Sequence, residues 1–191
     1  AGTAADRTRA ETMTTALDAR LAGRFPDAAK TFLEAADGRV ISYGDLQAES
    51  ARMAGALVTL GVKPGDRVAV QVSKSPEALV LYLGCVRAGA VYLPLNTAYT
   101  PAEIEYFLTD ARPAVFVCDP RKRDQLQPIA AAAGAAIETL GVWRSPDESA
   151  GSLSDKALAA SEGFDTVARG PDDLAAILYT SGTTGRSKGA M

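Results

Sequence analysis

The sequence of 191 residues contains no histidine and only two cysteines. Histidine is the commonest general base and the commonest metal ligand in proteins, so its absence argues against a serine–histidine nucleophile and against an all-protein zinc site. Cys85 and Cys118 are far apart in the chain and lie among apolar neighbours. We therefore expect two buried thiols in a reducing compartment.

The sequence also lacks a strong charge excess and a long apolar run. It carries 20 basic and 23 acidic residues, for a net charge of −3, which argues against a nucleic-acid binder. The basic run at 121–123 is interpreted as a solvated helix start. No apolar run approaches the length of about 20 residues that a membrane helix needs, and the polar residues 1–12 do not resemble a signal peptide. We expect a soluble, cytoplasmic protein with no membrane or nucleic-acid partner.

Strand-like and helix-like segments alternate along the chain. Strands are predicted at 67–72, 90–95, 114–119, 135–140 and 174–180, and helices at 9–23, 43–60, 76–88, 101–111 and 121–134. Asp-Gly between the apolar runs 29–35 and 39–43 predicts a hairpin. Short apolar strands of this kind are typical of strands that helices bury on both faces. We expect an α/β fold, with a layered, mostly parallel sheet, crossover helices and an N-terminal hairpin.

Three of the predicted helices carry start signals. Ser42 can cap the first, Ser75 precedes Pro76, and Thr100 precedes Pro101, which is the pattern of an N-cap followed by a helix-opening residue. Residues 141–172 break the alternation and predict a surface loop. A short helix at 153–162 lies within it, and Trp143 is interpreted as a loop anchor.

The stretch "SGTTGRSKG", residues 181–189, follows the last predicted strand directly. Glycines allow a loop to bring successive backbone N–H groups close to an anion. Hydroxyl side chains and one lysine add further donors, and no acidic residue lies between Leu174 and Met191. Such a loop suits a polyphosphate, although the order of residues is not that of a Walker A loop.

"YTSGTTGRSKG" resembles the phosphate-binding loop of the adenylate-forming enzymes, which are acyl-CoA synthetases, luciferases and peptide-synthetase adenylation domains. The match falls on Thr180, Ser181, Gly182, Thr183, Thr184, Gly185, Lys188 and Gly189, while Ser187 stands where proline is usual. "SYGDL", "GVKPGDRVAV" and the block at 86–119 also resemble that family, in the same order. The resemblance covers residues 25–191.

The resemblance implies an activity in two steps. A carboxylate attacks the α-phosphate of ATP to give an acyl-adenylate and pyrophosphate, and the thiol of CoA then takes the acyl group and releases AMP; magnesium accompanies the phosphates. It further implies that Thr180, Ser181, Gly182, Thr183, Thr184 and Lys188 hold the outer phosphates and that Gly185 shapes the loop. No catalytic residue and no metal ligand is assigned within the chain.

The same resemblance suggests that residues 1–191 are the N-terminal portion of the AMP-binding (adenylation) domain, without the C-terminal domain. Chains of that family are much longer, and in them a further strand follows the loop. We therefore expect the loop to be a frayed end, the chain to be inactive by itself, and its exposed apolar surface to favour self-association.

The acyl substrate is suggested by similarity alone. Asn96 in "VYLPLNTAYT", and the loop with its Ser187, are most similar to malonyl-CoA synthetases, which suggests a small, malonate-like carboxylic acid as substrate. Two alternatives stay open. One is an amino-acid adenylation domain, which usually has aspartate at the position of Asn96; the other is a stand-alone, non-catalytic binding or scaffold domain.

Overall fold

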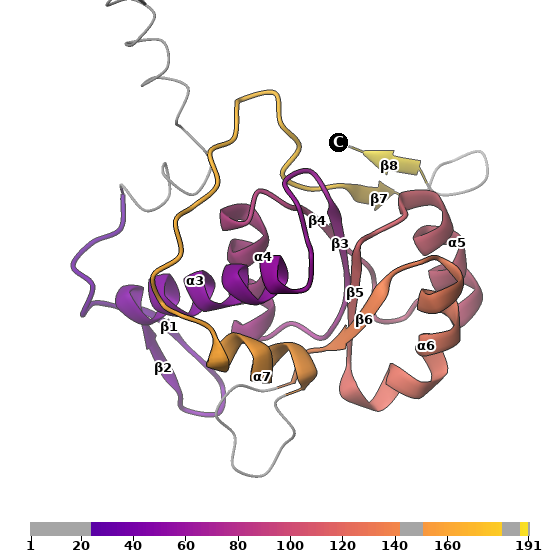
Figure 1. Ribbon diagram of the computed structural model, residues 1–191. Coiled ribbons are helices and arrows are strands. Elements are labelled where there is room, and N and C mark those ends of the chain that lie inside the picture. Colours follow the sequence, from indigo (N-terminus) through magenta and orange to yellow (C-terminus); the bar gives the residue numbers. More distant parts are fainter. Residues whose placement is uncertain (1–23, 142–150, 181–187, 191) are drawn as a thin grey trace, which may run out of the picture.

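A parallel sheet of four strands lies at the centre of the computed structural model, which describes residues 24–141, 151–180 and 188–190 (Figure 1). The strands are β3 (Arg67–Gln71), β4 (Val91–Pro94), β5 (Val115–Cys118) and β6 (Ala136–Thr139). Their spatial order is β4–β3–β5–β6, and each neighbouring pair is parallel. The predicted α/β fold with a mostly parallel sheet is confirmed. The predicted helix at 9–23 and Trp143 lie outside the described residues.

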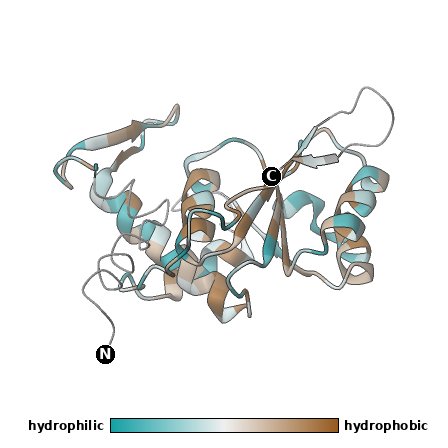
Figure 2. Cartoon of the chain, turned by 90° about the horizontal axis from the view of Figure 1, so that it is seen from above, coloured by the Kyte–Doolittle hydropathy of each residue, from teal (hydrophilic) through white to brown (hydrophobic). Residues whose placement is uncertain are grey.

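Helices cover both faces of this sheet. One face carries α4 (Pro76–Arg87) and α7 (Ser152–Ala159), with α3 (Tyr43–Thr59) packed against them, and the other carries α5 (Pro101–Ala111) and α6 (Arg123–Ala132). The short 3₁₀ helix η1 (Pro120–Lys122) leads into α6. Because side chains alternate along a strand, Val68 and Val70 join the first core while Ala69 joins the second. Figure 2 shows the hydrophobic residues concentrated where helices and sheet meet.

The helix starts agree with the local sequence. Ser42 and Thr100 each accept a hydrogen bond from a backbone N–H in the first turn, and Asp45 and Glu103 bond back to the capping residue. Ser75 accepts from the N–H of Ala78 at 3.1 Å. These reciprocal bonds satisfy N–H groups that have no partner inside a helix. The three predicted starts are confirmed.

The N-terminal hairpin is also confirmed. It pairs β1 (Thr31–Glu34) with β2 (Val40–Ser42) in antiparallel fashion. Gly38 has φ of 85°, a conformation that glycine adopts without steric cost. The hairpin lies at one end of the molecule, beside the start of α3 (Figures 1 and 2).

Both cysteine side chains are buried and free, as expected. Burial raises the pKa of Cys85, and it raises the pKa of Cys118 to about 11. A thiol must lose its proton to act as a nucleophile, so both residues serve as packing groups at neutral pH.

After α7 the chain returns across the helices to the edge of the sheet. Arg52 donates to the carbonyl oxygens of Leu158 and Ala160 at 2.9 and 2.7 Å, and Arg87 donates to the carbonyl oxygen of Phe164 at 3.1 Å. The two bonds from Arg52 hold the end of α7, and the bond from Arg87 holds the extended segment that follows it. Neither arginine was expected from the sequence to guide the chain.

The predicted strand at 174–180 is only partly present. Ala176 forms a single parallel bridge with Tyr92 of β4, and the chain then leaves the sheet as β7 (Leu178–Thr180). Leu174 and Leu178 are 38% and 54% exposed. The segment borders β4 at the sheet edge, and none of its residues from 174 to 180 is buried, so it is not covered on both faces as the apolar run predicts.

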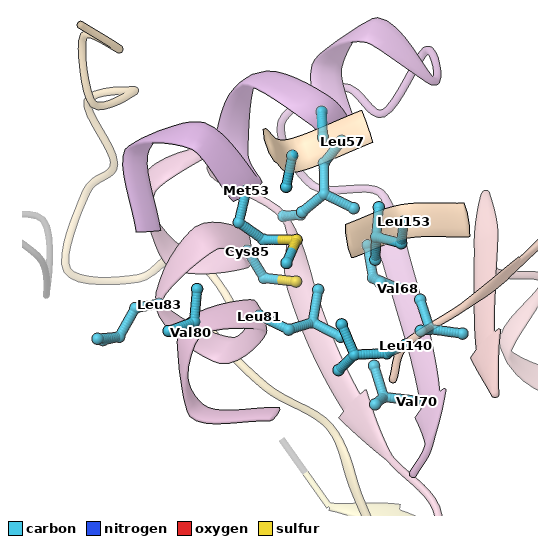
Figure 3. Packing of buried hydrophobic residues seen from close by; sticks show 14 of the residues in the cluster. Met53, Leu57, Val68, Val70, Val80, Leu81, Leu83, Cys85, Leu140 and Leu153 are labelled. Carbon is cyan, nitrogen blue, oxygen red and sulfur yellow. The ribbon is translucent and has the colours of Figure 1, made fainter. Parts of the chain in front are cut away.

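The contact between α3 and α4 is close enough to exclude any side chain at Gly84. A Cβ atom there would lie 2.6 Å from Cγ and 2.8 Å from Cβ of Met53, and Figure 3 shows Met53 pointing from α3 toward α4 beside Cys85. We expect Gly84→Ala to lower the free energy of unfolding by about 1–3 kcal/mol, because overpacking outweighs the helix propensity of alanine. Urea denaturation measures the change.

The matched control is Gly55→Ala in α3. A Cβ there would lie 3.5 Å from the Cβ of Ala160, which is an ordinary contact. This substitution should raise the free energy of unfolding by up to about 1 kcal/mol. Equal stability of the two variants would contradict the close packing of α3 on α4.

Candidate phosphate-binding site

The predicted phosphate loop connects two short strands that pair with each other. β7 and β8 (Lys188–Ala190) are antiparallel, with Leu178 opposite Ala190, Tyr179 opposite Gly189 and Thr180 opposite Lys188. The expectation of a frayed end is therefore wrong, because three residues after the loop return to pair with the strand before it. This pairing brings together the two ends of a loop that the sequence shows only as a linear motif.

Two of the seven predicted site residues lie in the described part of the chain. Thr180 is the last residue of β7 and is exposed, and Lys188 is the first residue of β8. The other five lie outside the described residues: Ser181, Gly182, Thr183, Thr184 and Gly185. The structure thus places the two ends of the motif opposite each other.

Tyr179 attaches the base of this hairpin to α5. Its ring lies 4.6 Å from the ring of Phe107, measured between centroids, with an interplanar angle of 52°. Its hydroxyl donates to the carboxylate of Asp110 at 2.5 Å. Burial raises the pKa of Tyr179, and the neighbouring carboxylate raises it further, so the hydroxyl remains a donor at neutral pH.

The sequence analysis assigned no functional role to Tyr179 or to Asp110. The position of Tyr179, directly before the first residue of the motif, could have indicated that it supports the loop. The position of Asp110 did not indicate a contact with Tyr179, because Asp110 stands 69 residues earlier in the chain.

A cleft of about 650 Å³ lies where β3 and β4 end. In parallel sheets with helices on both faces, ligands bind at the carboxyl ends of the strands. The lining is partly apolar, with Val70, Tyr92 and Leu95, and partly polar, with Ser73, Lys74, Asn96 and Thr97. Burial raises the pKa of Tyr92 to about 12, so this hydroxyl does not act as a base near neutral pH.

Asn96, which the sequence analysis used to compare subfamilies, has a structural role at this cleft. Its side-chain oxygen accepts from the N–H of Ala98 at 2.9 Å, and its backbone carbonyl accepts from the side chain of the buried Gln71 at 3.0 Å. Gln71 also donates to the carbonyl of Tyr99 at 3.2 Å. These bonds hold the turn that leads from β4 into α5.

Within the described residues, no group of three or more cysteine or acidic side chains could hold a metal ion. Across the same part of the chain, every helix is too short or too polar to span a bilayer.

Comparison with known proteins identifies the family of this chain. A family profile described as "AMP-binding enzyme" matches residues 19–191. The chain belongs to this family of AMP-binding enzymes. The resemblance to the adenylate-forming enzymes is thereby confirmed.

Relatives within the AMP-binding family include a crystal structure of apo MatB from Rhodopseudomonas palustris. It is 59% identical, with a TM-score of 0.86, over 94% of this chain and 34% of that one. An ATP-bound structure of MatB from the same organism matches equally well. The expected fold, that of the N-terminal domain of adenylate-forming enzymes, is confirmed.

The curated relatives are more varied. The AMB antimetabolite synthetase AmbB of Pseudomonas aeruginosa is 40% identical over 82% of this chain and 11% of its own length. A feruloyl-CoA synthase of an Amycolatopsis species is 34% identical over 81% of this chain and 28% of its own. The chain therefore spans only about a third or less of the proteins it matches.

Gly189 permits the pairing of β8 with β7. A Cβ atom at this position would lie 2.9 Å from Cγ2 of Ile177 and 3.7 Å from the ring of Tyr179. We expect Gly189→Ala to weaken the hairpin and to raise amide hydrogen exchange at Thr180 and Lys188 by about 5-fold or more, since closer packing than van der Waals contact must be relieved.

The control is Ala190→Ser, a change of similar size at the next, exposed position of β8. It should leave exchange at the hairpin unchanged. Faster exchange in both variants alike would show that the space beside Ile177 does not govern the pairing.

Proposed function

We propose that this chain is the N-terminal portion of the adenylation domain of a longer, ATP-dependent acyl-CoA synthetase. It spans 34% of the MatB chain, with 59% identity. The whole protein would join a carboxylic acid to CoA through an acyl-adenylate and release AMP. The observation that carries this proposal is the antiparallel pairing of Thr180 with Lys188, which closes the Gly/Ser/Thr loop between them.

A closed loop of this composition suits the outer phosphates of ATP. Backbone N–H groups of a glycine-rich turn form a concave set of donors for an anion. The hydroxyl groups of Thr180, Ser181, Thr183 and Thr184 add donors, and Lys188 adds a positive charge. The proposed role of these residues is to bind the β- and γ-phosphates and to stabilise the charge on the departing pyrophosphate, without moving a proton.

Magnesium and CoA belong to the proposal for the whole protein. Magnesium is usually bound by substrate phosphates together with one or two carboxylates. The described residues contain no cluster of acidic side chains that fits this need. We therefore assign no magnesium ligand to them, and we place the catalytic groups and the acyl pocket in the part of the enzyme that this chain does not span.

Malonate is the substrate that we propose. The support is the similarity of "VYLPLNTAYT" and of the loop to malonyl-CoA synthetases, together with the 59% identity to MatB. Neither stretch is assigned to the acyl group. An amino-acid adenylation domain is the alternative within the family, and the two differ in the acceptor, which is CoA in one case and a carrier protein in the other.

Lys188→Ala in the whole enzyme tests the phosphate site. We expect it to weaken binding of ATP by about 10- to 150-fold, which is the loss expected for one charge-assisted hydrogen bond, and to leave AMP binding nearly unchanged. Calorimetry with both nucleotides measures the difference. The matched control is Lys63→Ala, which removes an exposed lysine from the turn before β3 and should affect neither nucleotide.

Equal losses for ATP and AMP in Lys188→Ala would place this lysine away from the outer phosphates. Unchanged binding of both would remove the loop from the nucleotide site altogether.

The substrate is tested by pyrophosphate release from the whole enzyme with malonate, methylmalonate, acetate and a long-chain fatty acid. We expect malonate to give the highest kcat/KM. A clear preference for the long-chain acid would contradict the assignment. The 191-residue chain, tested in parallel with ATP, magnesium, malonate and CoA, should form no AMP, because the groups that orient the carboxylate and the α-phosphate lie elsewhere.

A further inference from the structure

Tyr179 stands directly before the first residue of the phosphate loop, and it contacts α5 with both its ring and its hydroxyl. The ring packs on Phe107, which is 2% exposed and belongs to the core between α5 and the sheet. The hydroxyl donates to the carboxylate of Asp110. A ring contact allows rotation and sliding, whereas a hydrogen bond at the far end of the side chain fixes its direction.

The helix that carries Asp110 is held at both ends. At its start, the side chain of Thr100 accepts from the N–H of Glu103, and the carboxylate of Glu103 accepts from the N–H of Thr100. At its end, the guanidinium of Arg67 in β3 donates to the carbonyl of Ala111 at 2.8 Å. Asp110 is therefore attached to the central strand of the sheet through one intervening residue.

Among the residues that the structure describes, few other contacts orient the hairpin of β7 and β8. Each of its strands has three residues, and an isolated two-stranded hairpin is marginally stable in water. Its chain meets the sheet through the single bridge between Ala176 and Tyr92. Tyr179 acts on both strands, since it belongs to β7 and lies opposite Gly189 of β8.

We propose that the hydrogen bond from Tyr179 to Asp110 sets the orientation of the hairpin formed by β7 and β8, from which the phosphate loop extends, and thereby raises the affinity for ATP. Tyr179 is a positioning residue, because alternation along β7 places it on the face opposite Thr180 and away from the proposed phosphate contacts. This inference rests on the proposed function of the loop. A loop that is already oriented loses less conformational entropy when ATP binds.

The test uses the whole enzyme and compares the dissociation constants for ATP and AMP by calorimetry. Tyr179→Phe keeps the ring and removes the donor, and Asp110→Ala removes the acceptor. Each should weaken ATP binding by about 3- to 10-fold and AMP binding by less than about 2-fold. Asp110→Asn should restore ATP affinity, since an amide oxygen also accepts from a tyrosine hydroxyl.

The double variant Tyr179→Phe with Asp110→Ala should bind ATP no more weakly than the worse single variant, because both changes remove the same bond. Tyr82→Phe, which removes a hydroxyl from an aromatic residue of α4, is the control and should leave both constants unchanged. The unfolding temperature should stay within about 3 °C of the parent in every variant, as expected for an exposed hydrogen bond.

Two results would overturn the positioning role. One is unchanged ATP affinity in Tyr179→Phe and Asp110→Ala while Lys188→Ala loses it, which leaves the phosphate site in place. The other is an equal loss of ATP and AMP affinity with a lowered unfolding temperature, which indicates general destabilisation. Failure of Lys188→Ala to affect ATP would instead refute the proposed function of the loop.

Discussion

Burial of β3 and β5 on both faces is the constraint on which the rest of the architecture depends. The apolar side chains of these strands alternate between two cores, one under α4 and α7 and the other under α5 and α6. Neither face can meet water without a large loss of hydrophobic stabilisation. Each connection between successive parallel strands must therefore carry a helix to one face or the other, and the alternating sequence pattern follows from this need.

Strand β3 contains one fully buried polar side chain, that of Gln71. Its hydrogen bonds connect the buried sheet to the loop hairpin. Gln71 is 1% exposed, and its amide donates to two carbonyl groups of the turn after β4. A buried amide without partners would cost free energy, so the turn is held close to the sheet. That turn leads into Thr100 and the start of α5, and α5 in turn carries Phe107, on which the loop hairpin packs. The position of the hairpin thus depends on β3, through the turn after β4 and through α5.

On the opposite side of the molecule, the segment after α7 leads the chain to this position. Arg52 bonds the carbonyl groups at the end of α7, and Arg87 bonds a carbonyl group of the extended segment that follows. Carbonyl groups that lack a sheet or helix partner are satisfied here by charged donors. The segment then reaches the edge of β4 at Ala176, three residues before Tyr179. The two strands that flank the predicted phosphate loop are therefore attached to the folded body.

The sequence predicted the features that depend on neighbouring residues or on a repeating apolar pattern. These are the helix starts at Ser42, Ser75 and Thr100, the turn at Gly38 and the parallel α/β class. The phosphate loop was predicted in the same way, from nine consecutive residues that resemble a known motif. Tertiary structure decided the rest. The run 174–180 has the composition of a buried strand, yet its place at the sheet edge leaves Leu178 exposed. Three features depend on how separate elements pack against each other: the pairing of Thr180 with Lys188, the lack of space for a side chain at Gly84, and the bond from Tyr179 to Asp110. No local pattern in the sequence specifies which surfaces will meet.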